Sequence, residues 1–311
     1  MLRIGLSLVV LTLVIVLVDI DVAEVWALFV NANPVMAALS IALMLAQLLL
    51  TAIRWSLVND ALNIQLHRSV CLRLMCVGQF FNQCLPTSVG GDAIKIGVLV
   101  RGHGLPFKTA TLSVVMDRLV GVSVLLCLAV FGWLFFITIR PDAVAGSVWL
   151  TGILVAAVIV CASIVLFLFP WIARSDARWT NWPALQATAV TSNSLALNWP
   201  TTVYIVVSSA TVQGLIALSI FLASSALNIH LPPIAVILIP MILFVSILPF
   251  SFAGWGLREG AMVTGLALVG VAGHEAIAIS VFHGLTQLII GLPGAWITVT
   301  RTQIWPQADG S

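Results

Sequence analysis

The sequence predicts an all-α polytopic membrane protein with six full spans and two re-entrant helical hairpins arranged as an inverted repeat. Three observations support this prediction. Hydrophobic residues make up 61% of the chain and charged residues only 8%, whereas a soluble domain carries about 25% charged residues. Six apolar stretches reach the length of about 20 helical residues that crossing the hydrocarbon layer requires. Two further apolar stretches are broken by the matched sequences LPTSVGGDAIK at 85–95 and LPFSFAGWGLREG at 248–260.

The six full spans follow one another along the chain. We expect the first to be a retained membrane helix rather than a signal peptide, because no convincing small-x-small cleavage site follows it. Tryptophans near many of the predicted ends fit an aromatic belt at the membrane surface. The expected spans are 4–25, 35–57, 112–139, 149–172, 201–226 and 276–299.

The two broken stretches, 72–100 and 234–271, are predicted to be hairpins that turn inside the membrane. An arm such as 72–85 would be about 21 Å long at 1.5 Å per residue, which is too short to cross. Pro86 and Pro249 end the helices before them, and the glycines that follow allow the chain to turn. Eight ordinary helices with glycine kinks are the alternative.

Lysines and arginines in the short loops orient the chain with both termini in the cytoplasm. The first half, 1–140, and the second half, 149–300, then each contain two spans, a hairpin and a span. One half starts inside and the other outside, so the two hairpins enter from opposite faces, as in the inverted repeats of secondary transporters. We expect residues 1–311 to form a single membrane domain.

The two breaks predict a binding site, because non-helical backbone within the hydrocarbon layer must be buried in protein or line a cavity. A new helix starts after each break, and its free amide groups favour an anion. Lys95 and Arg258 stand about one turn into these helices and are predicted to bind one phosphate together. The polar residues and glycines expected to line the site are Asn82, Ser88, Gly90, Gly91, Ser251, Gly254 and Gly256.

Acidic residues accompany both basic residues. Asp92 and Glu259 are suited to three roles, and the sequence leaves all three open: capping the helix starts, pairing with the basic residues in alternation with a phosphate, or carrying protons. Asp117 and Arg118 lie near the start of the predicted span 112–139. Charges within a membrane are costly and usually face a functional interior, although an arginine near a helix end also reaches the headgroups by snorkelling.

Other polar residues are less informative. Arg54, near the cytoplasmic end of the span 35–57, either snorkels or contributes to the site. His283, in the last span, is favoured as a packed polar residue over a proton relay. The five cysteines show no CxxC spacing and are expected to be reduced packing residues. We expect no cofactor and no metal, and the absence of a nucleotide-binding loop argues against direct use of ATP.

Three stretches, LPTSVGGDAIKIGVLVRGHG, MDRLVG and PFSFAGWGLREGAMV, resemble in this order the flippase-type transmembrane domain of bacterial lysylphosphatidylglycerol synthases. The resemblance covers nearly the whole chain. It places the family's motifs on Gly90, Gly91, Asp92 and Lys95, on Asp117 and Arg118, and on Pro249, Gly254, Gly256, Arg258 and Glu259. The first basic position is more often arginine in this family, and Lys95 keeps the charge but loses the bidentate fork.

The resemblance implies a flippase-like transporter in the bacterial cytoplasmic membrane for an anionic phospholipid or a polyprenyl-phosphate-linked lipid. Aminoacyl-transferring relatives carry a soluble catalytic domain after the membrane part; this chain stops at Ser311, so we expect no aminoacyl transfer and no enzyme activity. A membrane-embedded enzyme acting on such a lipid and a proton-coupled small-anion transporter stay open as alternatives. The net charge of +2 implies no nucleic-acid partner, and a homodimer is the working expectation for assembly.

Overall fold

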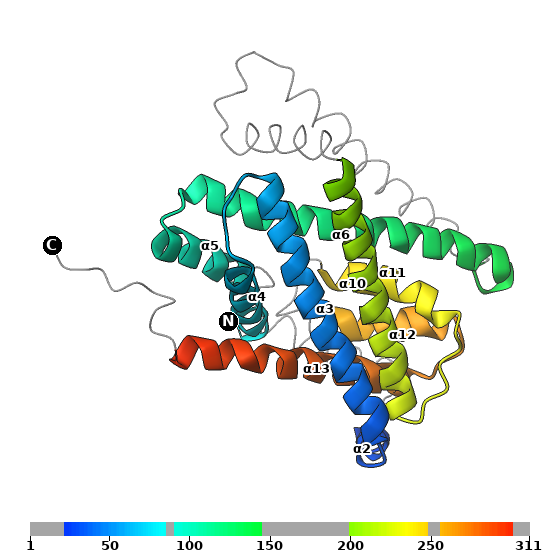
Figure 1. The fold of residues 1–311 in the computed structure, drawn as a ribbon. Coiled ribbons are helices and arrows are strands. Elements are labelled where there is room, and N and C mark those ends of the chain that lie inside the picture. Colours follow the sequence, from blue (N-terminus) through cyan, green and yellow to red (C-terminus); the bar gives the residue numbers. More distant parts are fainter. Residues whose placement is uncertain (1–21, 85–89, 145–198, 248–255, 301–311) are drawn as a thin grey trace.

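The computed structural model describes residues 22–84, 90–144, 199–247 and 256–300, and these ranges fold into helices joined by short turns (Figure 1). The all-α prediction is confirmed for this part of the chain. Four of the helices are long and apolar enough to cross a membrane. They are α3 (Pro34–Ala61), α6 (Phe107–Ile139), α10 (Trp199–Ala226) and α13 (Gly273–Thr300). They correspond to the predicted spans 35–57, 112–139, 201–226 and 276–299.

The other two predicted spans lie mostly or wholly outside the described residues. The span 149–172 falls in the undescribed stretch before α10. The span 4–25 overlaps the described chain only at its end, where α2 (Val22–Val30) begins. A short 3-10 helix, η1 (Pro141–Val144), follows α6.

Shorter helices occupy the two stretches that the sequence predicts to be broken. α4 (Arg68–Cys84) and α5 (Gly90–His103) form the first pair, and α11 (Ala235–Ile247) and α12 (Leu257–Ala267) form the second. Their lengths of 17, 14, 13 and 11 residues are all below the roughly 20 residues that a full span requires. In each pair the two helices pack against each other.

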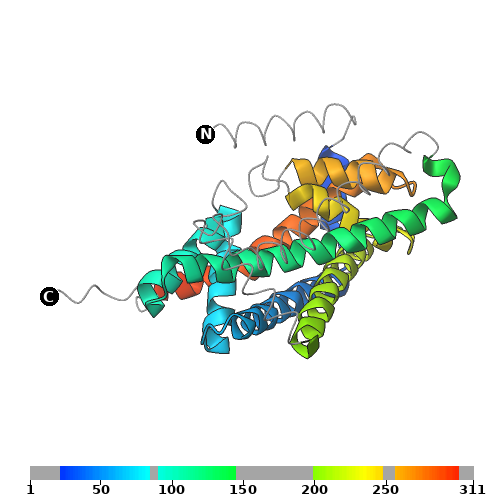
Figure 2. The same cartoon turned by 90° about the horizontal axis from the view of Figure 1, so that it is seen from above.

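The long helices and the short pairs pack in a reciprocal pattern. α3 and α10 lie against each other. α4 packs against α13, and α11 packs against α6, which Figure 2 shows as the long green helix beside the yellow one. The first helix of each short pair therefore rests on the last long helix of the other half of the chain. Two large apolar clusters result, one around α4 and α5 and the other around α11 and α12.

Two glycines bring helix backbones together at the equivalent places in this pattern. A side chain at Gly132 on α6 would collide with the carbonyl of Ile237 on α11. A side chain at Gly294 on α13 would collide with the carbonyl of Cys76 on α4. Small residues at such contacts let membrane helices approach closely, which increases van der Waals packing where lipid supplies no hydrophobic drive.

Gly294→Ala is expected to lower the free energy of unfolding by about 1–3 kcal/mol, because the added methyl group overpacks a backbone contact. Gly214 on α10 is the matched control, since a side chain there would meet no atom within 4 Å. Gly214→Ala should be neutral or stabilise by up to about 1 kcal/mol through helix propensity. Thermal unfolding of both variants in one detergent measures the difference, and an equal loss in the two would contradict the packing argument.

Candidate functional site

Charged residues near the first break form a cluster across α3, α5 and α6. Asp92, in the first turn of α5, accepts hydrogen bonds from Lys95 Nζ at 3.3 Å and from Arg118 Nε of α6 at 2.7 Å. Asp117, the residue before Arg118, accepts from Arg54 Nε and Nη2 of α3 at 2.9 and 3.0 Å. Two ion-pair groups therefore lie side by side, joined by adjacent residues of α6. We call these five side chains the α5 charge cluster.

Four members of the α5 charge cluster are shielded from solvent and lipid. The side chains of Arg54, Asp117, Lys95 and Asp92 are exposed by 6%, 6%, 6% and 8%. Buried charges are tolerated when they are paired and hydrogen-bonded, as these are. The side chain of Arg118 is 47% exposed, so Arg118 is the accessible end of the cluster.

The α5 charge cluster has an excess of positive charge. Its three basic side chains, Arg54, Lys95 and Arg118, face two carboxylates. Among the residues that the structure describes, no further carboxylate is ion-paired to them. One formal positive charge is left in a setting where uncompensated charge is unfavourable, and an anion of one negative charge would neutralise it.

The surroundings of Lys95 hold its side chain in place. The stem lies across Gly78 of α4, where any side chain would collide with it. The amino group stands 5.5 Å from the centre of the Trp55 ring, within the range of a cation–π interaction. Trp55 Nε1 in turn donates to Ser113 Oγ at 3.0 Å, and Ser113 donates to Asn59. These supporting residues share no sequence motif, so their contacts with Lys95 were not predicted.

Asn82 and the two glycines of the first break join α4 to α5. Asn82 Oδ1 accepts a hydrogen bond from the backbone N–H of Gly91 at 2.9 Å. A side chain at Gly91 would collide with Asn82 and with the carbonyl of Gly78. Gly90 and Gly91 are buried. Asn82 thus already occupies one of the free amides that were expected to face an anion.

The second break has its own charged group. Arg258 Nη2 lies 2.8 Å from Glu259 Oε1, and Arg258 Nε lies 3.1 Å from Ser280 Oγ of α13. Ser280 donates to the same Glu259 oxygen at 3.0 Å. The other Glu259 oxygen accepts from the backbone N–H of Gly256, whose φ is 89°. Glu259 therefore caps α12 and pairs with Arg258 at once, while alternation of that pairing with a phosphate stays a prediction.

The structure places the predicted basic residues in two separate pairs, Lys95 with Asp92 and Arg258 with Glu259. Joint binding of one phosphate by Lys95 and Arg258 stays a prediction. Three predicted lining residues lie outside the described residues: Ser88, Ser251 and Gly254.

A polar chain crosses the contact between α4 and α13. Gln83 Nε2 donates to Gln287 Oε1 at 2.7 Å, and the Gln287 amide nitrogen lies 2.9 Å from His283 Nε2. His283 is 2% exposed and stands one turn after Ser280. Within the described chain, His283 Nδ1 has no hydrogen-bond partner. These hydrogen bonds link α4, which precedes the first break, to α13, whose Ser280 contacts Arg258. The sequence indicated that His283 is a packed polar residue, but it did not predict this link between α4 and α13.

A model of the lysylphosphatidylglycerol synthase transmembrane region matches residues 1–294. The chain belongs to this family. The resemblance inferred from the three motifs is confirmed, and with it a multi-pass membrane protein with a lipid-related function. No curated protein and no solved structure matches the chain.

Proposed function

We propose that this family member moves an anionic phospholipid or a polyprenyl-phosphate-linked lipid across the bacterial cytoplasmic membrane. The observation that carries the proposal is the α5 charge cluster, which is buried, has one excess positive charge and has an accessible end at Arg118. A lipid phosphate has the charge that such a cluster lacks. Membership of a lipid-related membrane family supports a lipid as the source of that phosphate.

The proposal includes the inverted repeat of 1–140 and 149–300, the two re-entrant hairpins and cytoplasmic termini. The reciprocal packing of α4 on α13 and of α11 on α6 supports the repeat, as do the equivalent contacts at Gly132 and Gly294. The shortness of all four hairpin helices supports re-entry rather than crossing. Hairpins from opposite faces would bring both breaks toward the membrane interior.

An exchange of ionic partners would let a headgroup pass. Without lipid, Asp92 pairs with both Lys95 and Arg118. A phosphate arriving at Arg118 would replace Asp92 there and leave Asp92 to Lys95. In the second half of the chain, Arg258 is paired with Glu259. There the phosphate would replace Glu259 as the partner of Arg258. Because every buried charge keeps a partner at each step, the barrier stays below that of moving a bare charge through hydrocarbon.

In this mechanism the ion pairs bind and release the phosphate, and no covalent bond is made or broken. The proposal therefore assigns no catalytic residue, no cofactor and no enzyme activity. A homodimer stays a prediction.

Arg118→Gln is expected to weaken binding of phosphatidylglycerol by about tenfold to a hundredfold, through the loss of one charged hydrogen bond to the phosphate. Lys95→Gln is expected to weaken it by a similar factor, because Asp92 without Lys95 stays on Arg118 and competes with the phosphate. The probe is fluorescent phosphatidylglycerol in phosphatidylcholine vesicles containing the purified protein, with binding and movement between leaflets both recorded. Arg73→Gln is the matched control, because Arg73 is exposed on α4 and contacts Ser69. It should leave both quantities unchanged.

The same vesicles separate the alternatives. A polyprenyl phosphate that competes better than phosphatidylglycerol would assign the substrate to the polyprenyl class. Inorganic phosphate that is transported in place of either lipid would overturn lipid movement in favour of small-anion transport. Binding and movement that survive both glutamine variants in folded protein would place the site elsewhere.

A further inference from the structure

A hollow of about 500 Å³ lies on α5, away from the buried residues Asp92 and Lys95. Arg101, near the end of α5, and Phe107, at the start of α6, line one end of it. Apart from Arg101, the lining is apolar and consists of Ala93, Ile94, Ile96, Gly97, Val100 and Phe107. α5 thus carries charge on its inner face and an apolar depression on the other.

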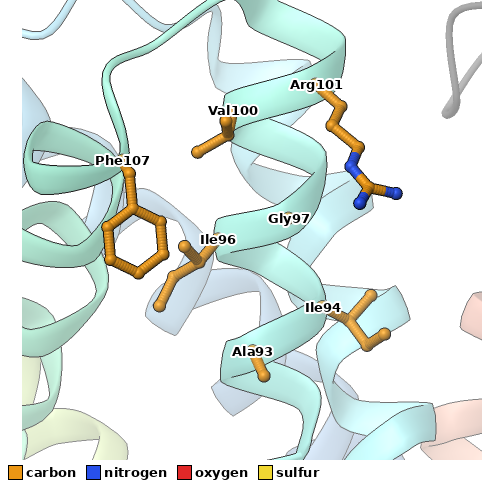
Figure 3. Close-up of a pocket in the computed structure, with 7 residues that line it drawn as sticks. All are labelled: Ala93, Ile94, Ile96, Gly97, Val100, Arg101 and Phe107. Atoms are coloured by element: carbon orange, nitrogen blue, oxygen red, sulfur yellow. The ribbon is translucent and has the colours of Figure 1, made fainter.

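The absence of a side chain at Gly97 deepens this hollow. A Cβ atom at Gly97 would meet no atom within 4 Å. Figure 3 shows Phe107 and Ile96 on one side of Gly97, and Arg101 and Ile94 on the other. The result is an open apolar trough with a guanidinium group along one wall.

The apolar lining follows α5 for more than two turns. Ala93 and Arg101, both lining residues, are about 12 Å apart along the helix at 1.5 Å per residue. The guanidinium group of Arg101 stands near the carboxyl-terminal end of α5.

The chemistry of the hollow matches that of an anionic lipid. An acyl chain fits an apolar trough, and a phosphate fits a guanidinium group. Arg101 is exposed, and it makes no ion pair with any residue that the structure describes. A zwitterionic lipid would bring its own cation to Arg101 and gain less.

We infer that the hollow over Gly97 is a binding site for an acyl chain of an anionic phospholipid whose phosphate is held by Arg101. This site is separate from the α5 charge cluster and holds a lipid beside it. The inference requires only that the lipid binds, so it is tested by binding alone and does not depend on whether the lipid is moved.

The test uses phosphatidylglycerol with a photoreactive group in one acyl chain, at a few per cent in phosphatidylcholine vesicles containing the full chain. Phosphatidylcholine with the same photoreactive chain serves as the second probe. Mass spectrometry of the cross-linked peptides locates the label. The phosphatidylglycerol probe is expected to label residues 93–107 about tenfold more than the phosphatidylcholine probe. This is the difference in affinity that one charged hydrogen bond provides.

Two variants examine the two halves of the inference. Gly97→Leu should fill the trough and reduce phosphatidylglycerol labelling of this segment about tenfold, since leucine is a good helix former and has room at this position. Gly214→Leu, at the open position on α10, should leave the labelling unchanged. Arg101→Gln should bring phosphatidylglycerol labelling down to the phosphatidylcholine level, while the photoreactive acyl chain still labels the trough.

Three outcomes would overturn the inference. Equal labelling of the unaltered protein by the two probes would reduce the hollow to ordinary contact with bulk lipid. A preference for phosphatidylglycerol that survives Arg101→Gln would place the phosphate on another group. Undiminished labelling in Gly97→Leu would place the acyl chain outside the trough. Failure of the proposed function is a different result: binding and movement that survive both Arg118→Gln and Lys95→Gln, whatever the labelling of residues 93–107.

Discussion

Asp117→Ala should lower the free energy of unfolding by about 3–5 kcal/mol, the usual effect of removing one member of a buried ion pair. Asp117 accepts two hydrogen bonds from the Arg54 guanidinium, and the side chains of both residues are 6% exposed. Without Asp117 the arginine charge stays buried. Among the described residues, its remaining hydrogen-bond partners are the Ser209 hydroxyl of α10 at 3.3 Å and the backbone carbonyl at position 117. Because Arg54 ties α3 to both α6 and α10, the loss affects the centre of the helix assembly.

Two controls identify the cause of that loss. Asp60→Ala removes an exposed carboxylate from the end of α3 and should change stability by less than about 0.5 kcal/mol. The double variant Arg54→Leu with Asp117→Leu removes both charges and should recover most of the lost stability, since apolar replacements of buried pairs are often neutral. Thermal unfolding in one detergent measures all of them. A double variant as unstable as Asp117→Ala would contradict the unpaired charge as the cause.

The membrane helices were predictable because their signal is local. An apolar run of sufficient length needs no knowledge of its neighbours, and proline with glycine marks where a helix ends. The boundaries were less accurate. α6 begins at Phe107 rather than at 112, so Lys108 lies inside the helix, and α3 continues to Ala61 rather than ending at 57. Polar residues at a helix end look like loop in a hydropathy pattern, although helical hydrogen bonding continues through them.

The charged residues could be picked out from the sequence, because charge is rare in this chain, and pairing of Asp92 and Glu259 with the basic residues was one of the expected roles. Their partners on distant helices could not be predicted. The pairing of Arg54 with Asp117 joins α3 to α6 across a long stretch of sequence, and it follows from the packing of those helices. The same holds for Trp55 beside Lys95. Long-range packing in the folded chain decides such contacts, and a single sequence carries no pattern for them.

Asp92→Asn is expected to tighten binding of phosphatidylglycerol by about a hundredfold or more and to slow its release correspondingly. Asp92 holds both Lys95 and Arg118. Each charged hydrogen bond is worth about 1.5–3 kcal/mol, so two freed cations offer about 3–6 kcal/mol to a phosphate that no longer competes with a carboxylate. The lipid would become the resident partner of the cluster, and its movement between leaflets would fall.

Stability provides a second readout of the same change. The side chain of Lys95 is 6% exposed, and in Asp92→Asn its charge stays buried without the partner carboxylate. The lipid-free variant should therefore unfold more readily than the unaltered protein. Phosphatidylglycerol should restore that stability in the variant and add less to the unaltered protein, because a ligand stabilises only the state that binds it. Phosphatidylcholine is the matched lipid control and should restore little.

The three roles of the acidic residues predict different results for Asp92→Asn in vesicles with and without a pH gradient. A residue that only caps α5 would leave movement mostly intact, with a loss of about 0.3–1 kcal/mol in stability, because the amide oxygen still accepts a hydrogen bond. A proton carrier would lose its response to the gradient while exchange at equilibrium continued. The paired arrangement of Asp92 with Lys95 and Arg118 favours the third result, in which binding tightens and movement slows at every pH gradient. Unchanged binding and unchanged movement would refute partner exchange and leave capping as the role of Asp92.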